Sequence, residues 1–120
     1  PRKSIVLSVK DLAYNPMVKA IIAFSNSGST AKLVSTMRPS VKIITISPSI
    51  NVSRQTSLLW GVESINSRDA HGWKDMMDIS KQIIKKDKSI KKKDYVIITA
   101  GLPFGHANMT NMIRFYKVGT

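Results

Sequence analysis

Residues 19–34, KAIIAFSNSGSTAKLV, decide the fold, because an apolar run passes through a loop of small residues into an amphipathic segment. The apolar run, 18–24, is nearly continuous, as expected for a β-strand that is covered on both faces. A proline at position 39 ends the segment after the loop, in which apolar residues recur at helical spacing: Ala31, Leu33, Val34 and Met37. The stretch therefore predicts a strand–loop–helix unit, the building block of a parallel sheet.

The same alternation continues in both directions along the chain. Apolar runs predict further strands at 41–47, 62–66, 95–100 and 111–118. Helical spacing of apolar residues predicts helices at 5–13, 51–61 and 73–84. In the second of these helices, Asn51 is the expected N-cap and Gly61 the expected residue after the last turn. The order α-β-α-β-α-β-α-β-β predicts an α/β fold, a three-layer α/β/α sandwich with helices on both faces of one sheet.

The element order also predicts the arrangement of the strands. In a doubly wound sheet the first strand lies near the middle, successive units run outward, and the chain then returns to the other side. We therefore expect a five-stranded, mostly parallel sheet with the spatial order 3-2-1-4-5. Roughly ten residues join the last two strands, which is short for a crossover, so the last strand is expected to be antiparallel. The 120 residues show no repeat or linker and predict a single domain, 1–120.

Composition narrows the class of protein. The chain has no cysteine, which excludes a disulfide framework and a thiolate site and fits a reducing cytosol. Its apolar runs are much shorter than the roughly 18 residues of a membrane span, so we expect a soluble protein. The net charge is +12, and lysines gather at 81–93, KQIIKKDKSIKKK. A solvated lysine face is the simpler interpretation, and a surface for a polyanion such as nucleic acid is the alternative.

The predicted topology places a binding site. Ligands of doubly wound sheets bind beyond the carboxyl ends of the two strands at which the strand order reverses. Those strands are 18–24 and 95–100, followed by the loops SNSGST (25–30) and GLPFGHANM (101–109). The first loop offers hydroxyl groups, a glycine and the N-terminus of a helix, which favour a phosphate group. It matches neither the Walker A nor the G-x-G-x-x-G pattern, so a serine-capped loop without a ligand remains open.

Residues for catalysis are not gathered in any motif. His71 and His106 have no carboxylate or cysteine at metal-ligand spacing, and no serine has an evident base. Asp75 and Asp78 share a helix face and are interpreted as salt-bridge partners of the lysines on that helix. Trp60 is expected in the core or at an interface. We therefore predict no catalytic residue and no metal site in this chain.

Three motifs, taken in order, resemble the carboxy-terminal domain of pyruvate kinase. Residues 19–39 are similar to that family's Ser/Thr-x-Ser-Gly-x-Ser/Thr-Ala loop and the helix that ends in Arg-Pro. SRQTSLLWGV (53–62) resembles its Ala-Arg-x-x-x-Leu-x-x-Gly-Val segment. DYVIITAGLPFGHANMTNMIRFYKVG (94–119) resembles its ending. The resemblance covers nearly the whole chain.

This resemblance implies a part of a larger cytoplasmic enzyme of glycolysis. Pyruvate kinase moves phosphate from phosphoenolpyruvate to ADP, giving pyruvate and ATP, with Mg²⁺ and usually K⁺. Its active site lies in a TIM barrel that this chain lacks, so we expect no activity and no cofactor in the fragment alone. The implied roles are regulation and assembly. The implied partners are the catalytic barrel, other subunits of a homotetramer, and a sugar-phosphate or AMP effector, whereas nucleic acid and membrane are not expected.

The family's effector contacts carry over to particular positions. The resemblance implies phosphate contacts from the first loop: Ser25, Asn26, Ser27, Gly28, Ser29 and Thr30. It implies that the second loop forms the opposite wall of the effector site, through Gly101, Pro103, Gly105 and His106. It also implies that the indole of Trp73 lies against the effector. An arginine common at the fifth position of the first loop is Ser29 here, and an arginine that follows the tryptophan in some members has no counterpart, with Ser80 near its place. Either the effector differs, or the pocket is kept only for packing.

One alternative of a different class remains. A freestanding, basic α/β protein that binds a phospho-ligand or nucleic acid would also explain the first loop and the lysines at 81–93.

Overall fold

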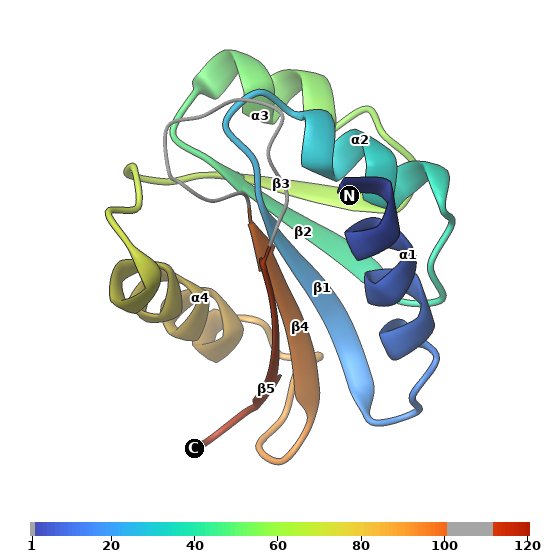
Figure 1. Cartoon of the computed structure of the whole chain (residues 1–120). Helices are drawn as coiled ribbons and strands as arrows, with labels where there is room; N and C mark the ends of the chain where they lie inside the picture. The colour runs from blue at the N-terminus through green and yellow to red at the C-terminus, as the bar shows by residue number, and fades with distance from the viewer. Residues whose placement is uncertain (1, 101–111) are drawn as a thin grey trace.

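The structure, a computed structural model, describes residues 2–100 and 112–120 (Figure 1). Strands and helices alternate along most of this length, and the elements are, in chain order, α1 (Arg2–Ala13), β1 (Val18–Phe24), α2 (Ser29–Thr36), β2 (Lys42–Ser47), α3 (Ile50–Thr56), β3 (Val62–Asn66), α4 (Trp73–Lys86), β4 (Tyr95–Ala100) and β5 (Met112–Lys117). The predicted element order is confirmed.

The strands form one sheet with the order β3-β2-β1-β4-β5. β1 pairs in parallel with β2 and β4, and β2 pairs in parallel with β3. β5 runs antiparallel to β4, with Thr99 opposite Ile113. The predicted spatial order and the antiparallel last strand are therefore both confirmed. β1 and β4 are neighbours and parallel, so their carboxyl ends lie side by side at the point where the strand order reverses.

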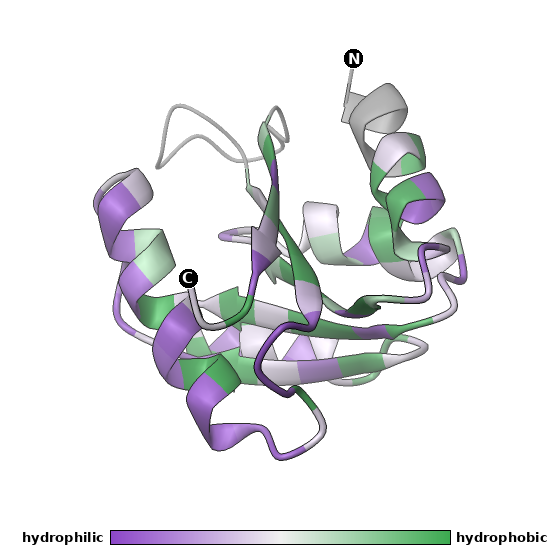
Figure 2. Cartoon of the chain, turned by 90° about the horizontal axis from the view of Figure 1, so that it is seen from below, coloured by the Kyte–Doolittle hydropathy of each residue, from purple (hydrophilic) through white to green (hydrophobic). Residues whose placement is uncertain are grey.

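Helices cover both faces of the sheet (Figures 1 and 2). α1, α2 and α3 lie on one face, and α4 lies on the other. This arrangement follows from the connections, because β1, β2 and β3 advance in one direction while the segment through α4 returns the chain to the other side of β1. In Figure 2 the inner side of α4 is hydrophobic and its outer side is hydrophilic.

The sheet divides the core into two apolar clusters. Ile21, Ile43 and Ile97 face α1 and α2, whereas their neighbours Ile22, Ile44 and Ile98 face α4. All six side chains have no exposed surface. Burial on both faces explains why the central strands are nearly continuous apolar runs rather than alternating apolar and polar residues.

The helix predicted at 51–61 is shorter and begins earlier. α3 spans Ile50–Thr56, and its N-cap is Ser49, whose Oγ accepts a hydrogen bond from the Val52 N–H at 3.3 Å. The prediction of Asn51 as the N-cap is therefore wrong, because a serine two residues earlier already caps the first turn. The chain turns after Thr56, whose Oγ1 lies 2.8 Å from Ser64 Oγ on β3. Gly61, with φ +71°, immediately precedes β3 and does not cap the helix.

Trp60 lies in the turn between α3 and β3 and is not part of the core. Its side chain is 48% exposed, and the Arg38 guanidinium lies over its ring, 4.8 Å from the centroid. The core alternative of the sequence prediction is thus wrong for this residue, since the turn that follows the early end of α3 carries the indole outward.

No helix within residues 2–100 and 112–120 combines the length and apolar character that a bilayer span requires.

Candidate functional site

The loop at 25–30 leaves β1 and enters α2 through a network of its own hydrogen bonds. The Ser25 N–H donates to the Ile46 carbonyl at 3.0 Å, which extends the pairing of β1 with β2. Ser25 Oγ accepts a hydrogen bond from the Gly28 N–H at 3.0 Å, and Ser27 Oγ lies 3.0 Å from Ser29 Oγ. These contacts fold the loop into a tight turn that holds the start of α2 in place.

Gly28 is the N-cap of α2 and has a left-handed backbone, with φ +90°. A β-carbon at this position would lie 3.3 Å from Thr56 Cγ2 and 3.6 Å from Val52 Cγ1. Both the backbone angle and the close approach of α3 favour glycine. The sequence SNSGST therefore meets a local structural need, whether or not it also binds a ligand.

A pocket of about 370 Å³ opens between this loop and α3. Its walls come from the loop, the first turn of α2 and the last turns around α3: Ser27, Gly28, Ser29, Lys32, Gln55, Thr56 and Leu59. The volume lies within the range of small-molecule sites, roughly 300 to 1,000 Å³. The pocket is therefore of a size that fits a small molecule.

The pocket has a positive electrostatic environment. α2 has no acidic residue in its first turn, so its N-terminal partial charge is not neutralised there. Lys32 lies one turn into the helix, lines the pocket and forms no ion pair with any of the described carboxylates. A lysine at this end of a helix opposes the helix dipole. That cost is offset when an anion binds at the same place.

The structure brings together part of the predicted first loop. Ser27, Gly28 and Ser29 line the pocket, and Asn26 is exposed beside it. Ser25 and Thr30 are only 4% and 3% exposed, so their side chains support the loop from within. The predicted opposite wall lies outside the described residues: Gly101, Pro103, Gly105 and His106. β1 and β4 themselves end on the same side of the sheet, since they are parallel and Ala23 pairs with Thr99.

Trp73 does not line this pocket. It begins α4 on the other face of the sheet and packs against the apolar cluster beneath that helix. Arg114 of β5 lies over its ring, with the guanidinium carbon 5.3 Å from the centroid. This pair could not be predicted from the sequence, because only the antiparallel register of β5 brings residue 114 next to the start of α4.

The loop before Trp73 is fixed by Asp75 in the first turn of α4. Its carboxylate accepts hydrogen bonds from the Arg68 guanidinium, at 2.6 Å, and from the His71 backbone N–H, at 2.9 Å. Arg68 also forms an ion pair with the second carboxylate oxygen. The sequence prediction that Asp75 pairs with lysines of its own helix is wrong, because the carboxylate points back to the preceding loop. No described ion pair involves Asp78.

We expect this cluster to make stability depend on pH. The hydrogen bond from Arg68, then that from the His71 N–H, lower the pKa of Asp75 from 3.8 to about 2. Because the pKa is lower in the folded state, the stabilisation is present above about pH 4 and is lost as the pH falls toward 2. Asp75→Asn should therefore destabilise the protein at pH 7 and have little effect near pH 2, as measured by urea unfolding at both values.

Arg68→Gln should raise the pKa of Asp75 toward its ordinary value in an NMR titration. Asp69→Asn, at an exposed neighbour without a described ion pair, is the matched control and should change stability equally little at both pH values. A loss of stability from Asp75→Asn that is the same at pH 7 and pH 2 would contradict the assignment.

Metal ligands do not gather anywhere in residues 2–100 and 112–120, where no group of three His, Asp or Glu side chains could hold an ion. The pocket residues that sequence reasoning missed are Lys32, Gln55, Thr56 and Leu59. Lys32 could have been identified from the sequence, because a lysine in the first turn of a helix opposes the helix dipole and is unfavourable there unless an anion is nearby. Gln55, Thr56 and Leu59 could not have been identified in this way, since their position at the pocket depends on how α3 crosses above β2.

Comparisons with known proteins agree on one family. A model of the family described as "Pyruvate kinase, alpha/beta domain" matches residues 3–116. The pyruvate kinases of Staphylococcus aureus strains USA300, NCTC 8325 and COL are each 35% identical to the chain over 116 residues. The match covers 97% of the chain and 20% of each relative, so the chain spans about a fifth of the length of these relatives.

Proposed function

This chain belongs to the pyruvate kinase family as its alpha/beta domain, and from that premise we propose that it is the regulatory and subunit-contact domain of a pyruvate kinase. The parent enzyme transfers phosphate from phosphoenolpyruvate to ADP in cytoplasmic glycolysis. The catalytic barrel and the sites for Mg²⁺ and K⁺ belong to the part of the enzyme outside this chain. The domain alone has no turnover, and it acts by binding an effector and by contacting other subunits.

The observation that carries the effector role is the positive pocket beside the loop at 25–30. It combines the N-terminus of α2, the hydroxyls of Ser27 and Ser29, and the unpaired charge of Lys32. Such a combination favours the phosphate of a sugar phosphate or of AMP. The pocket lies beyond the carboxyl end of β1, between the loop that follows this strand and α3, and ligands of doubly wound sheets bind beyond the carboxyl ends of the strands.

Lys32 bears on the choice of effector. The family's loop arginine is replaced by Ser29 here, but Lys32 lines the same pocket and restores one cation. A lysine binds phosphate as a point charge, without the two parallel hydrogen bonds that an arginine provides. We therefore propose an effector with one phosphate in this pocket, held by backbone amides and hydroxyls and one ammonium group.

Differential scanning calorimetry of the 120-residue chain tests the effector role. The compounds are fructose 1,6-bisphosphate, glucose 6-phosphate, ribose 5-phosphate and AMP, each titrated to saturation. A ligand at a hundred times its Kd adds about 2.7 kcal/mol to the free energy of unfolding. Stabilisation that is lost in Lys32→Gln but retained in Lys74→Gln, an exposed lysine of α4, supports the proposal. Stabilisation by none of the four compounds would refute it.

The edge strand β5 supports the role in assembly. It pairs only with β4 among the described strands, so its outer edge presents backbone N–H and C=O groups. Phe115 on this strand is 39% exposed and stacks on Tyr95, with ring centroids 4.6 Å apart. An exposed edge with an aromatic side chain favours pairing with another subunit, in keeping with a homotetrameric parent enzyme.

A further inference from the structure

A second pocket, of about 460 Å³, lies at the opposite end of the molecule from the loop at 25–30. Its residues come from the end of α4, the turn before β4 and the segment after β5. Because β1 and β4 are parallel neighbours, the start of β4 and the end of β1 lie at opposite ends of these strands. The two pockets therefore cannot share a small ligand.

The floor of this pocket is apolar and well packed. Ile84, Ile90 and Tyr116 line it and are only 5%, 6% and 6% exposed. Two of them belong to α4 and the turn after it, and Tyr116 comes from β5, where it pairs with Val96 of β4. Since these side chains belong to the apolar cluster beneath α4, the floor is a fixed surface of the core.

Three lysines form the rim above this floor: Lys81, Lys85 and Lys92. Two of them are held in place by their neighbours. The Lys81 ammonium lies over the Tyr116 ring, 5.9 Å from the centroid. The stem of Lys92 lies across Gly119, where an added β-carbon would come within 2.8 Å of Lys92 Cγ. Gly119, with φ +94°, thus leaves the space that this lysine occupies.

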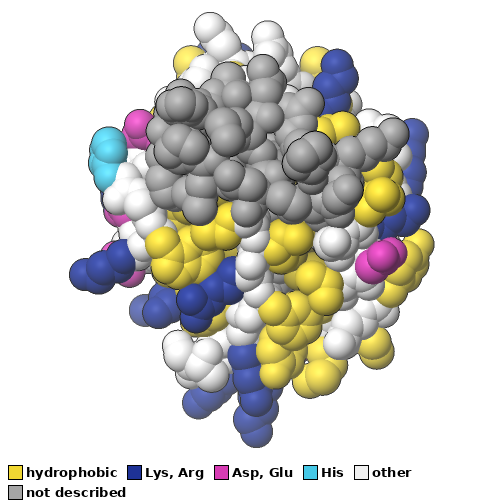
Figure 3. All heavy atoms as spheres, viewed as in Figure 1, with side chains coloured by type: hydrophobic (Ala, Val, Ile, Leu, Met, Phe, Trp, Pro, Cys, Tyr) yellow, Lys and Arg dark blue, Asp and Glu magenta, His cyan; other side chains and the backbone are white. Residues whose placement is uncertain are grey.

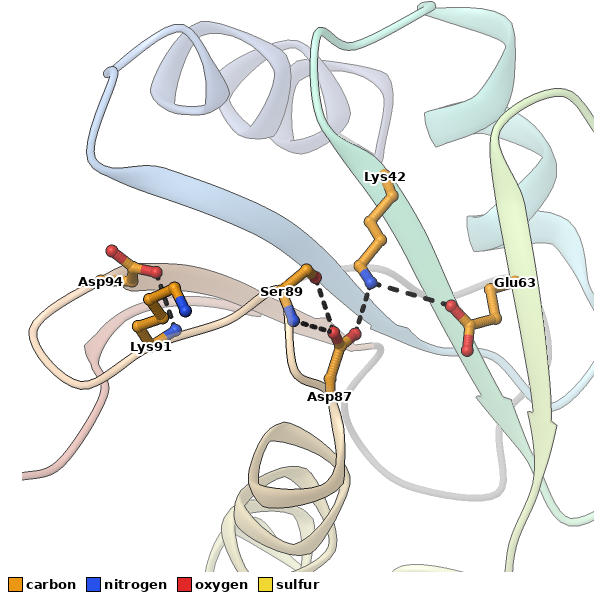
Figure 4. A network of polar contacts seen from close by, with 6 residues as sticks. All are labelled: Lys42, Glu63, Asp87, Ser89, Lys91 and Asp94. Carbon is orange, nitrogen blue, oxygen red and sulfur yellow. Dashed lines mark hydrogen bonds and ion pairs between the residues drawn. The ribbon is translucent and has the colours of Figure 1, made fainter.

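No aspartate or glutamate side chain neutralises the rim. None of the three lysines forms an ion pair with the acidic residues, all of which are described. The two acids nearest in sequence are engaged elsewhere (Figure 4). Asp87 binds Lys42 and accepts the Ser89 N–H at 2.9 Å, and Asp94 accepts the Lys91 backbone N–H at 2.8 Å.

The pocket lies within the most basic part of the surface. Residues 81–93 hold seven lysines and one acid. Figure 3 shows basic side chains at the lower left and bottom of one face, over the region where Figure 1 places α4 and the turn before β4. Charge alone would attract any polyanion, whereas the combination of an apolar floor with the lysine rim favours a small molecule that has both an anionic and an apolar part.

We propose that this pocket binds a small organic phosphate that carries an apolar group. The phosphate lies among Lys81, Lys85 and Lys92, and the apolar group lies on Ile84, Ile90 and Tyr116. Ammonium groups that are held near one another donate charge-assisted hydrogen bonds to phosphate oxygens. The apolar contact adds a term that inorganic phosphate and the nucleic-acid backbone lack. The site is independent of the effector role proposed for the loop at 25–30.

Binding of 1-naphthyl phosphate to the 120-residue chain, followed by calorimetry in about 0.15 M salt, tests the proposal. We expect saturable binding of one molecule, at least about tenfold tighter than that of inorganic phosphate or of 1-naphthol. A variant with Lys81→Gln, Lys85→Gln and Lys92→Gln should bind about tenfold more weakly or worse. Gly119→Ala keeps every charge but displaces Lys92, and it should also weaken binding.

The matched control replaces three other lysines of the same segment, Lys86, Lys88 and Lys91, with glutamine. These lysines are exposed and do not line the pocket, and their replacement removes the same total charge as the first triple variant. The control should change the affinity less than about twofold, since distant surface charges are screened at this salt concentration. Equal weakening in both triple variants, binding of inorganic phosphate as tight as that of the naphthyl ester, or no saturable binding would each overturn the proposal.

Discussion

An Ile22→Ala variant is expected to lose about 3 kcal/mol of its free energy of unfolding, the cost of truncating a fully buried isoleucine in a packed core. Ile22 has no exposed surface, lies in the central strand β1 and belongs to the apolar cluster beneath α4. It pairs with Ile44 on one side and with Ile98 on the other, so paired strands flank the cavity on both sides. Urea unfolding followed by circular dichroism measures the loss.

Ile50→Ala is the matched control for this prediction. Ile50 begins α3 and is 51% exposed, so the same truncation should change stability by less than about 0.5 kcal/mol. Because β1 also leads directly into the loop at 25–30, a destabilised β1 weakens the support of the candidate effector pocket.

A loss below about 1 kcal/mol for Ile22→Ala would mean that the two-sided burial of β1 is not what stabilises the sheet.

The sheet could be predicted because each strand carries its own signal. The mostly apolar runs at 18–24, 41–47 and 95–100 are typical of buried β-strands and fit few other structures. The intervening helices then fixed the parallel pairing and the position of β1 in the middle. The short connection between β4 and β5 was enough to predict the antiparallel last strand.

The end of α3 could not be predicted in the same way. Its sequence continues with Leu58 and Leu59 at helical spacing, so the apolar pattern predicts a helix that extends to Gly61. In the structure Leu58 is 87% exposed, and Thr56 Oγ1 bonds to the Val52 carbonyl and lies beside Ser64 of β3. Contacts between α3 and the sheet therefore end the helix, and a local sequence pattern does not contain them.

One part of the candidate pocket could be predicted from the sequence, and another part could not. The loop at 25–30 was found from its own residues and from the topology, because the end of a central strand is a fixed place in such a fold. The wall from α3 was missed, since Gln55 and Leu59 reach the pocket only through the crossing of that helix above β2. The stacking of Arg114 on Trp73 was missed because it depends on a pairing between residues distant in sequence.

A Ser27→Asp variant is expected to lose the whole stabilisation by the single-phosphate effector, whichever of glucose 6-phosphate, ribose 5-phosphate and AMP it is, about 2.7 kcal/mol at a hundred times its Kd. Ser27 lines the pocket and lies 3.0 Å from Ser29 at the entrance to α2. An aspartate there places a negative charge where the phosphate would bind, and it also occupies the helix N-terminus as a permanent internal anion. Calorimetric melting with and without the compound measures the loss.

The difference between the two melts is the informative quantity. The new carboxylate should itself stabilise the ligand-free protein by about 0.3 to 1 kcal/mol, through the N-terminus of α2, so the melting temperature alone would mislead. Gln82→Glu adds the same charge on the exposed face of α4 and should keep the full response to the compound. If Ser27→Asp responded to that compound as strongly as Gln82→Glu does, the phosphate that stabilises the protein would bind away from the loop at 25–30. The naphthyl phosphate titration would then show whether phosphate binds in the lysine-rimmed pocket instead.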